Sequence, residues 1–318
     1  MDTLTGLLDG PKARGAFLLK SVFGPRWSVR IEDRAPISVF TLVRGEGWVV
    51  PDEGEPVRLV PGDVAVARGP VPYTLTDTPG LRPQVTVGPD QRCSTPEGAD
   101  VSESMLLGVR TWGDADPGED ATVLLSGTYL EPGEIGRRLL ATLPPLLVRR
   151  AAGADAALVG LLAEETEKDL PGQELVLDRL LDLLLIGLLR GWLADPAGSA
   201  PGWYRAYADP VVGPALRLLH ADPAYAWTVA SLATKTGVSR SALARRFSEV
   251  MGEPPMTYLT DWRLTLAADL LREPQTTVAE AARRVGYGTA FALSAAFKRV
   301  RGMSPQEYRT RGSGGGGL

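Results

Sequence analysis

The stretches TVASLATKTGVSRSALARRFSEVMGEPPMTY (Thr228–Tyr258) and TVAEAARRVGYGTAFALSAAFKRVRGMSPQEY (Thr277–Tyr308) repeat one pattern. Matched positions lie 49 residues apart up to the glycine of each copy and 50 apart from the second helix onward, so the second turn has gained one residue. In each copy a threonine precedes a helix, a glycine turns the chain, and a Leu and a Phe four residues apart give the next helix an apolar face. One helical hairpin is a weak signal, whereas two copies in register predict a tandem helix-turn-helix.

Local signals support both copies. Thr277 and Glu280 have the spacing of a capping box, and Thr228 with Ser231 is a weaker version of the same signal. The turn glycines suit a left-handed backbone, which a side chain would disfavour. Ser239 is a good N-cap for the helix that follows the first turn. Such a unit places its second helix in the major groove of DNA.

Between the copies, apolar residues recur at helical spacing from Met256 to Leu271 and predict one connecting helix. A rigid connection would fix the separation of the two recognition helices. If both helices enter one face of a duplex, that separation should be about one DNA turn, roughly 34 Å.

The repeat resembles the AraC/XylS family of transcription regulators. The resemblance lies in GVSRSALARRF at Gly237–Phe247, in WRL at Trp262–Leu264, and in VGY, FKR, GMSP and YR between Val285 and Arg309. It covers about residues 205–310, roughly a third of the chain. It implies a seven-helix domain that binds double-stranded DNA at specific sequences, in a regulator that contacts RNA polymerase if it is an activator.

The charge is distributed unevenly along the 318 residues, a length that suggests two domains. From Trp203 onward there are 15 basic and 9 acidic residues, a net charge of +6, and the remainder has 19 against 29, a net charge of −10. A DNA-binding domain joined to a separate module would give this asymmetry. A chance fluctuation of surface charge is the alternative.

Several classes of protein are disfavoured by composition. The N-terminus lacks a basic region followed by an apolar core, so no secretion signal is visible. The most apolar segment, Leu183–Leu189, is far shorter than the ~20 residues that span a bilayer. A single cysteine excludes an internal disulfide framework. We therefore expect a cytoplasmic protein with no membrane partner.

Residues 16–125 contain short β-rich runs punctuated by Pro and Gly, which predict an antiparallel barrel or sandwich. The turn Val60–Asp63, followed by a strand and Gly69, resembles that of a cupin barrel. Many AraC-type regulators carry an N-terminal cupin-like sensing domain. The overall expectation is an α+β chain, with residues 1–150 as an effector-binding, cupin-like antiparallel β-barrel and residues 205–310 as the all-α DNA-binding domain.

The barrel lacks the residues of a cupin enzyme. The one histidine, His220, lies outside the barrel in a helix where a structural role is expected, and the resemblance implies that Tyr73 stands where regulators of this kind often have histidine. We expect no metal, no cofactor and no catalytic residues, because a Ser/His/Asp arrangement cannot be built without a nearby histidine. Arg30, Phe40 and Trp48 are candidates to line an effector pocket, but strand facing is undecided, so the effector site stays unknown.

Two helices are expected at about 155–170 and 173–194, after a connector at Leu139–Arg150. The second is apolar on more than one face, so it must be buried on several sides. Packing on the barrel is one explanation, and a two-helix dimer seam, which the resemblance favours, is the other. Residues 151–194 are thus a packing or dimerisation segment of a homodimer, 195–204 a linker and 311–318 a flexible tail.

The first recognition helix is expected to expose Ser239, Arg240, Ser241 and Arg245, with Ala244 beside them. In the family motif, Ser241, Ala244 and Arg245 stand where base-reading side chains usually are. We expect Arg245 to bind a guanine bidentately and Arg240 to contact phosphate or a base. The alternative is that these arginines, together with Arg246, bind only phosphates.

The second recognition helix offers fewer polar groups. Thr289, Ala290, Ser294 and Ala295 are expected to face outward, and Ala295 stands where the family often has arginine. We expect this unit to anchor the DNA backbone through Thr289, Ser294, Lys298 and the helix N-terminus.

Cys93 follows Arg92 and is either a reactive redox thiol or a bystander, since there is no second cysteine to form a disulfide within the chain. The predicted function is an effector-responsive regulator that binds a bipartite promoter site. The alternatives are a ligand-independent regulator whose barrel only dimerises and, less favoured, a cupin enzyme fused to a DNA-binding module.

Overall fold

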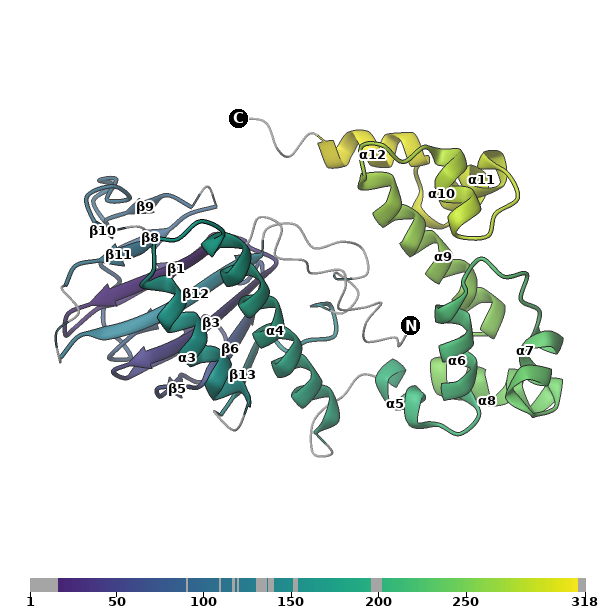
Figure 1. Ribbon diagram of the computed structural model, residues 1–318, viewed down its shortest axis with the longest axis horizontal. Helices are drawn as coiled ribbons and strands as arrows, with labels where there is room; N and C mark the ends of the chain where they lie inside the picture. The colour runs from purple at the N-terminus through teal and green to yellow at the C-terminus, as the bar shows by residue number, and fades with distance from the viewer. Residues whose placement is uncertain are drawn as a thin grey trace. The chain divides into compact units, whose positions relative to one another are not determined.

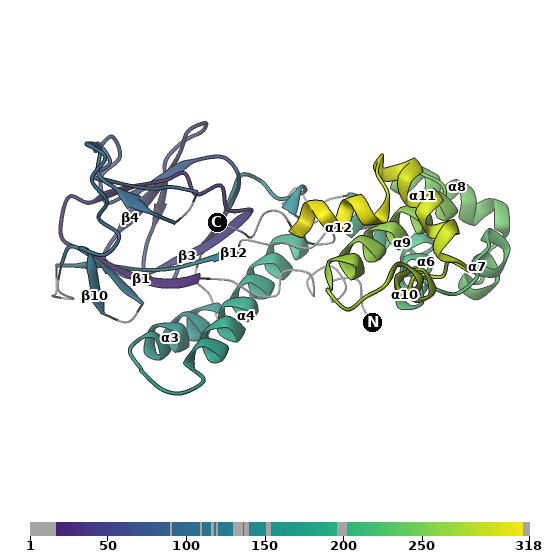
Figure 2. The ribbon, with the colours of Figure 1, turned by 90° about the horizontal axis from the view of Figure 1, so that it is seen from above.

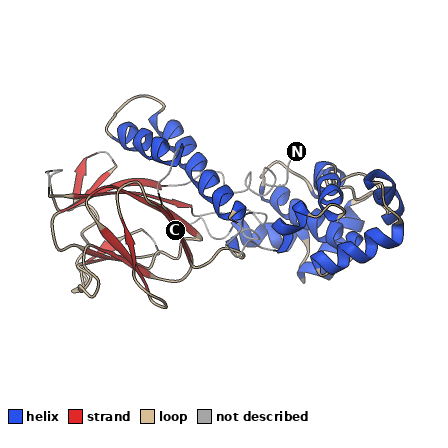
Figure 3. Cartoon of the chain, turned by 90° about the horizontal axis from the view of Figure 1, so that it is seen from below, coloured by secondary structure: helices blue, strands red, loops and turns tan. Residues whose placement is uncertain are grey.

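A computed structural model describes residues 17–89, 91–108, 110–115, 118, 120–129, 136, 140–150, 154–195 and 202–313. They form two compact units, one within Pro11–Pro132 and Leu140–Ala194 and the other mainly within Asp195–Leu318. The strands lie in the first unit, and the described part of the second is helical (Figure 3). Of the expected linker and tail, residues 196–201 and 314–318 lie outside the described residues.

The strands of the first unit form two facing sheets. One sheet has the order β10 (Leu106–Gly108), β11 (Thr111–Gly113), β1 (Phe17–Phe23), β12 (Thr122–Tyr129), β3 (Ile37–Arg44), β6 (Val64–Arg68) and β13 (Leu146–Arg149). The other has the order β5 (Val57–Leu59), β4 (Gly47–Pro51), β7 (Tyr73–Thr76), β2 (Ser28–Ile31), β8 (Val85–Val87) and β9 (Cys93–Ser94). The cupin-like fold is confirmed, with two refinements: the sheets do not close into one barrel, and the pairs β1–β11 and β2–β8 are parallel.

Two helices, α3 (Ala154–Thr166) and α4 (Gln173–Ala194), cover the outer face of the seven-stranded sheet (Figures 1 and 2). This cover explains why Ile37–Leu42 of β3 is buried at every position instead of alternating. The sheet and α4 meet closely at Gly127, where a Cβ atom would lie 2.3 Å from Leu181 Cδ2. Both expected helices are present, although α3 ends earlier than predicted.

The expected connector at Leu139–Arg150 is not a simple connector, because it contains strand β13. Residues 146–149 pair with β6 in antiparallel register, and Pro145 O accepts a hydrogen bond from Arg68 N at 2.9 Å. Pro144 and Pro145 directly precede β13, so neither proline removes a hydrogen bond from the pairing of β13 with β6. Arg150, just after β13, pairs with Asp63 of the cupin-like turn, whose side chain is 2% exposed. That carboxylate also accepts from Val60 N at 3.2 Å, which fixes the turn before β6.

The second unit contains α5 (Gly202–Ala208), α6 (Val212–Ala221), α7 (Val229–Thr236), α8 (Arg240–Met251), α9 (Pro255–Arg272), α10 (Val278–Arg284), α11 (Ala290–Arg301) and α12 (Pro305–Ser313). The described part of the second unit thus holds eight helices, one more than the resemblance implies. Two apolar cores share α9: Tyr258, Leu259 and Trp262 belong to the first, and four further residues of α9 belong to the second, Leu264, Ala267, Ala268 and Leu271. The predicted connecting helix is therefore a common wall of both helix-turn-helix units.

The helix caps follow the sequence signals with one reversal. Thr228 and Ser231 form a complete capping box, with both reciprocal bonds at 3.0 Å. Thr277 accepts from Glu280 N at 3.1 Å, and Glu280 returns no bond to the cap. The weaker signal thus gives the fuller cap, because the short serine side chain reaches the cap N–H directly. Gly237 has the expected positive φ of 73°.

Candidate functional site

Helix α8 has one buried side and one exposed side. Leu243 and Phe247 are fully buried in the first core, which fixes the rotation of the helix. Arg240, Ser241 and Arg245 are consequently exposed, as expected from the sequence. Arg245 is 78% exposed, and its ion pair with Glu249 is loose at 3.7 Å. Its guanidinium can therefore leave that pair for another acceptor at little cost.

Arg246 lies differently from the other expected DNA-contacting residues. Its Nε and Nη2 approach Asp209 Oδ2 at 2.9 Å and 2.7 Å, so α8 is tied to the turn between α5 and α6. The Asp209 side chain is 7% exposed, and its Oδ1 accepts from Val211 N and Val212 N at 2.9 Å. Burial raises the pKa of Asp209, but these backbone bonds and Arg246 together lower it below its ordinary value. The arrangement gives Arg246 a structural partner.

Ser239 is the N-cap of α8. Its Oγ accepts from Ala242 N at 3.2 Å and lies 3.3 Å from Ser241 Oγ. The side chain of Ser239 therefore serves the helix, and both hydroxyls stand at the exposed N-terminus, where the helix dipole favours a phosphate.

Helix α11 repeats the arrangement with other side chains. Leu293, Ala296 and Phe297 are buried, and Thr289 caps the helix by accepting from Ala292 N at 3.0 Å. Of the expected contact residues, Thr289 and Lys298 are exposed and Ser294 is half-buried.

The exposed side of α11 also carries Phe291, which the sequence analysis missed. This residue is 84% exposed, the highest value among the exposed large hydrophobic residues in the part of the chain that the structure describes. The repeat could have identified Phe291, because an offset of 50 residues places it where Ser241 stands in the first helix-turn-helix. A solvent-exposed phenylalanine on a recognition helix can contact the methyl group of thymine.

A cavity of about 490 Å³ lies between the two sheets of the first unit. Phe40 and Tyr73, stacked with ring centroids 5.7 Å apart, line it, and so do Trp27 and Trp112. Tyr73, which stands at the position often taken by a cupin histidine, is thus part of the cavity wall. Burial raises the pKa of Tyr73 well above its ordinary value, so the hydroxyl is neutral at pH 7.

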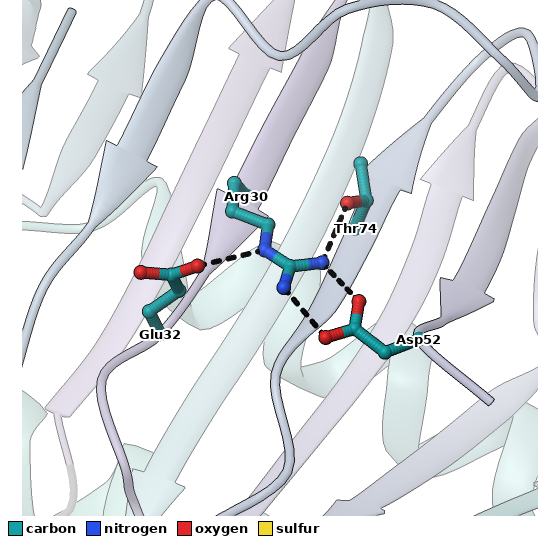
Figure 4. Close-up of polar contacts among 4 residues, drawn as sticks. All are labelled: Arg30, Glu32, Asp52 and Thr74. Atoms are coloured by element: carbon teal, nitrogen blue, oxygen red, sulfur yellow. Dashed lines mark hydrogen bonds and ion pairs between the residues drawn. The ribbon is translucent and has the colours of Figure 1, made fainter. Parts of the chain in front are cut away.

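The other two sequence candidates for the pocket do not line this cavity. Arg30 lies among polar groups, where it pairs with Asp52 and with Glu32 (3.0 Å) and reaches Thr74 Oγ1 at 3.5 Å (Figure 4). These contacts link β2 to its neighbour β7 and to Asp52, which follows β4 on the far side of β7. Trp48 on β4 is half-buried and is not among the lining residues of the cavity.

Cys93 lines the cavity at intermediate exposure. Burial raises the pKa of its thiol and outweighs the hydrogen bond to Ser102, which lowers the pKa. A raised pKa disfavours the reactive thiolate.

Within the described ranges, no three His, Cys, Asp or Glu side chains gather in a group that could hold a metal ion. Among the helices described, none is long and apolar enough to cross a membrane.

Comparisons with known proteins cover both units. The cupin family model matches residues 2–194, and the helix-turn-helix domain model matches residues 232–311. An AraC-like transcription regulator of Streptomyces lividans is 36% identical over 317 residues, 97% of this chain and 98% of that protein. One from Streptomyces antibioticus is 35% identical over 316 residues, 97% of this chain and 98% of that protein. Among solved structures, the chain is similar to the DNA-binding domain of AdpA, crystallised in complex with a target DNA. The match has 31% sequence identity, covers 32% of this chain and 92% of that domain's chain, and has a TM-score of 0.31.

Proposed function

The chain belongs to the family of AraC-like transcription regulators, and from that premise we propose that it binds two neighbouring major-groove segments of a promoter, one through α8 and one through α11. The observation that carries the proposal is the shared construction of the two helices. Each is capped at its N-terminus by a hydroxyl, buries a Leu and a Phe, and exposes the opposite side. Helix α9, common to both cores, keeps the two exposed sides at a constant separation.

In the first helix-turn-helix, Arg245 is the proposed base reader, and Arg240, Ser239 and Ser241 contact phosphates or base edges. Arg245 is free to approach a guanine because its pair with Glu249 is long and exposed. The proposal leaves Arg246 in the structural role given by Asp209, so a direct phosphate contact from Arg246 is secondary.

In the second helix-turn-helix, Thr289, Ser294 and Lys298 anchor the DNA backbone, and Phe291 adds an apolar contact to a thymine methyl group. Ala295 takes the place of Arg245, so the residues expected to face outward from α11, Thr289, Ala290, Ser294 and Ala295, include no arginine that could read a base bidentately. Base substitutions in the second half-site should therefore cost less than those in the first, except at the thymine that meets Phe291.

Selection from random DNA, followed by footprinting across a salt series, tests the whole proposal. We expect two protected major-groove segments about one turn apart, with binding that weakens steeply as salt rises. The Arg245→Ala variant should lose about 1–3 kcal/mol of discrimination at one base pair and bind other sequences almost equally well. An equal loss on all sequences would support phosphate binding only, and failure of selection would refute the proposal.

The first unit is proposed to sense an effector and to dimerise. The cavity between the sheets is the proposed effector site, residues 1–150 form the sensing domain, and residues 195–204 link it to the DNA-binding domain at 205–310. Effector control requires a different affinity for two states of the protein. A ligand-independent regulator remains the alternative, and a ligand-induced rise in melting temperature would exclude it.

The dimer seam is assigned to the side of α4 that the sheet and α3 leave open, within residues 151–194. There Leu175 and Leu183 are 66% and 51% exposed, eight residues apart on one side of the helix. Sedimentation should give a dimer that Leu175→Glu with Leu183→Glu converts to a monomer. A monomeric unmodified chain at all concentrations would contradict the assignment. As a DNA-binding regulator, the protein is proposed to act in the cytoplasm without catalysis, and to contact RNA polymerase if it activates.

A further inference from the structure

We infer that the cavity between the two sheets binds a neutral, largely aromatic molecule bearing carbonyl or ether oxygens, and that it rejects carboxylates. The inference rests on the proposed role of the first unit as the effector sensor and names the class of effector.

The shape of the cavity suits a ring compound. Its volume of about 490 Å³ lies within the usual range for small-molecule sites, roughly 300–1,000 Å³. Phe23 stacks on Trp27 with centroids 4.8 Å apart and meets Trp112 edge-on at 5.8 Å. Phe40 and Tyr73 form the second aromatic pair of the wall. Flat aromatic ligands stack well on such surfaces.

Two hydrogen-bond donors in this wall lack acceptors. Trp27 and Trp112 are 3% and 5% exposed, and neither indole Nε1 has a hydrogen-bond partner among the described residues. Buried donors are nearly always paired, and an unpaired one costs about 1–3 kcal/mol. Both Nε1 atoms are themselves buried, so an indole ring must turn toward the cavity before an oxygen acceptor on a bound molecule can satisfy it, whereas a pure hydrocarbon would leave both donors unpaired.

The charge of the wall decides against an anion. The described lining residues include no Lys, Arg or His, and their one carboxylate is Asp33. Asp33 accepts from Ala35 N at 3.0 Å and from Gln91 Nε2 at 3.4 Å. The raised pKa values of Tyr73 and Cys93 keep both groups neutral. A bound carboxylate would be buried beside Asp33 without a cation to pair with, which is strongly unfavourable.

The chain offers a direct assay, because Cys93 is its one cysteine and lines the cavity. The full chain is treated with N-ethylmaleimide, and the rate of alkylation is followed by intact mass. The probes are 2-acetylnaphthalene, 2-ethylnaphthalene and 2-naphthoate, which share a ring system and differ in acceptor and charge. We expect the ketone to protect Cys93 and to raise the melting temperature, and the carboxylate to bind at least about 100-fold more weakly.

Variants assign the effect to named groups. Trp27→Phe and Trp112→Phe keep the rings and remove the indole N–H groups. The variant that removes the donor used by the ketone should lower the preference for the ketone over the ethyl compound by about five- to tenfold. Trp48→Phe, outside the lining, is the matched control and should leave that preference unchanged. Asp33→Asn should narrow the gap between ketone and carboxylate.

Three results would overturn the inference. They are protection by 2-naphthoate equal to that by the ketone, a ketone preference unchanged in both tryptophan variants, and no protection by any probe at its solubility limit. DNA binding is measured on the same preparations with a selected site. Intact bipartite binding beside any of these results refutes the ligand class alone, whereas absent DNA binding refutes the proposed regulator whatever the probes do.

Discussion

Replacing Asp209 with alanine should destabilise the second unit and leave the first unchanged. The substitution removes the acceptor for Val211 N and Val212 N at the start of α6 and the partner of Arg246. Loss of a side-chain acceptor for backbone N–H groups at the start of a helix costs about 1 kcal/mol. Arg246 is 49% exposed, so the freed guanidinium is solvated and the lost pair adds little. A loss of about 1 kcal/mol corresponds to a fall of roughly 5 °C in the melting temperature of a unit of this size.

Calorimetry of the full chain can test this, because a selected DNA site identifies the transition of the second unit by raising its temperature. Asp209→Asn keeps an acceptor for the backbone and should cost about half as much. Arg246→Ala should lower the temperature of the same transition by less than Asp209→Ala does, and the double variant should be no less stable than Asp209→Ala alone. If Arg246→Ala left the transition temperature unchanged and lost as much DNA affinity as Arg245→Ala, the structural role of Arg246 would be refuted.

The pH dependence of this difference has a definite sign. The folded pKa of Asp209 lies below its ordinary value, so its charge stabilises the fold above the unfolded pKa of about 3.9. That contribution is lost as pH falls through the lower, folded pKa. The gap between the natural chain and Asp209→Asn should therefore be constant near neutrality and should close only below about pH 4. A gap that closes between pH 6 and 8 would contradict the assignment.

Four further substitutions test three other contacts. Gly286→Ala should cost about 3 kcal/mol in urea unfolding, because its φ is 86° and the new Cβ would lie 2.6 Å from Ala224 O. Gly237→Ala, where φ is 73° and the new Cβ would meet open space, should cost about 1–2 kcal/mol. Equal costs for the two variants would refute the close approach at Gly286. Phe291→Ala should change the free energy of unfolding by less than about 0.5 kcal/mol, because the side chain is exposed. In competition binding it should lower DNA affinity about fivefold only for sites that carry the contacted thymine, and an equal loss of affinity on all sites would count against the contact. His220→Phe should lower the free energy of unfolding in urea by about 1–3 kcal/mol, since the imidazole forms hydrogen bonds with Tyr207 Oη at 3.0 Å and Tyr258 Oη at 2.7 Å. An unchanged unfolding midpoint would show that these two hydrogen bonds do not stabilise the fold.

The second unit could be predicted well because its signals are local. The cap at Ser239, the positive φ of Gly237 and the helix through Trp262 each depend on residues within one or two turns. Helical spacing also decides which side is buried, so the exposure of Arg245 followed from the burial of Leu243.

The first unit was less predictable because its strands are positioned by distant partners. Alternation should reveal strand facing, but β3 is buried on both sides by the other sheet and by α3 and α4, which erases the pattern. The cavity could therefore not be assigned, and Arg30 and Trp48 were as plausible as Phe40 until register and facing were known. Strand β13 was missed because its four residues depend on pairing with β6.

The role of Arg246 shows the same limit inside the well-predicted unit, since its partner Asp209 lies 37 residues away. The repeat sharpens the difference between the two copies. The offset of 50 maps Arg246 onto Ala296, which is buried in the second core, so α11 is held at this position by packing and α8 by an ion pair. Packing does not titrate, whereas the Asp209 pair does. Below about pH 4, contacts made by α8 should therefore weaken before those made by α11, and footprints recorded across that range should lose the first half-site while the second persists.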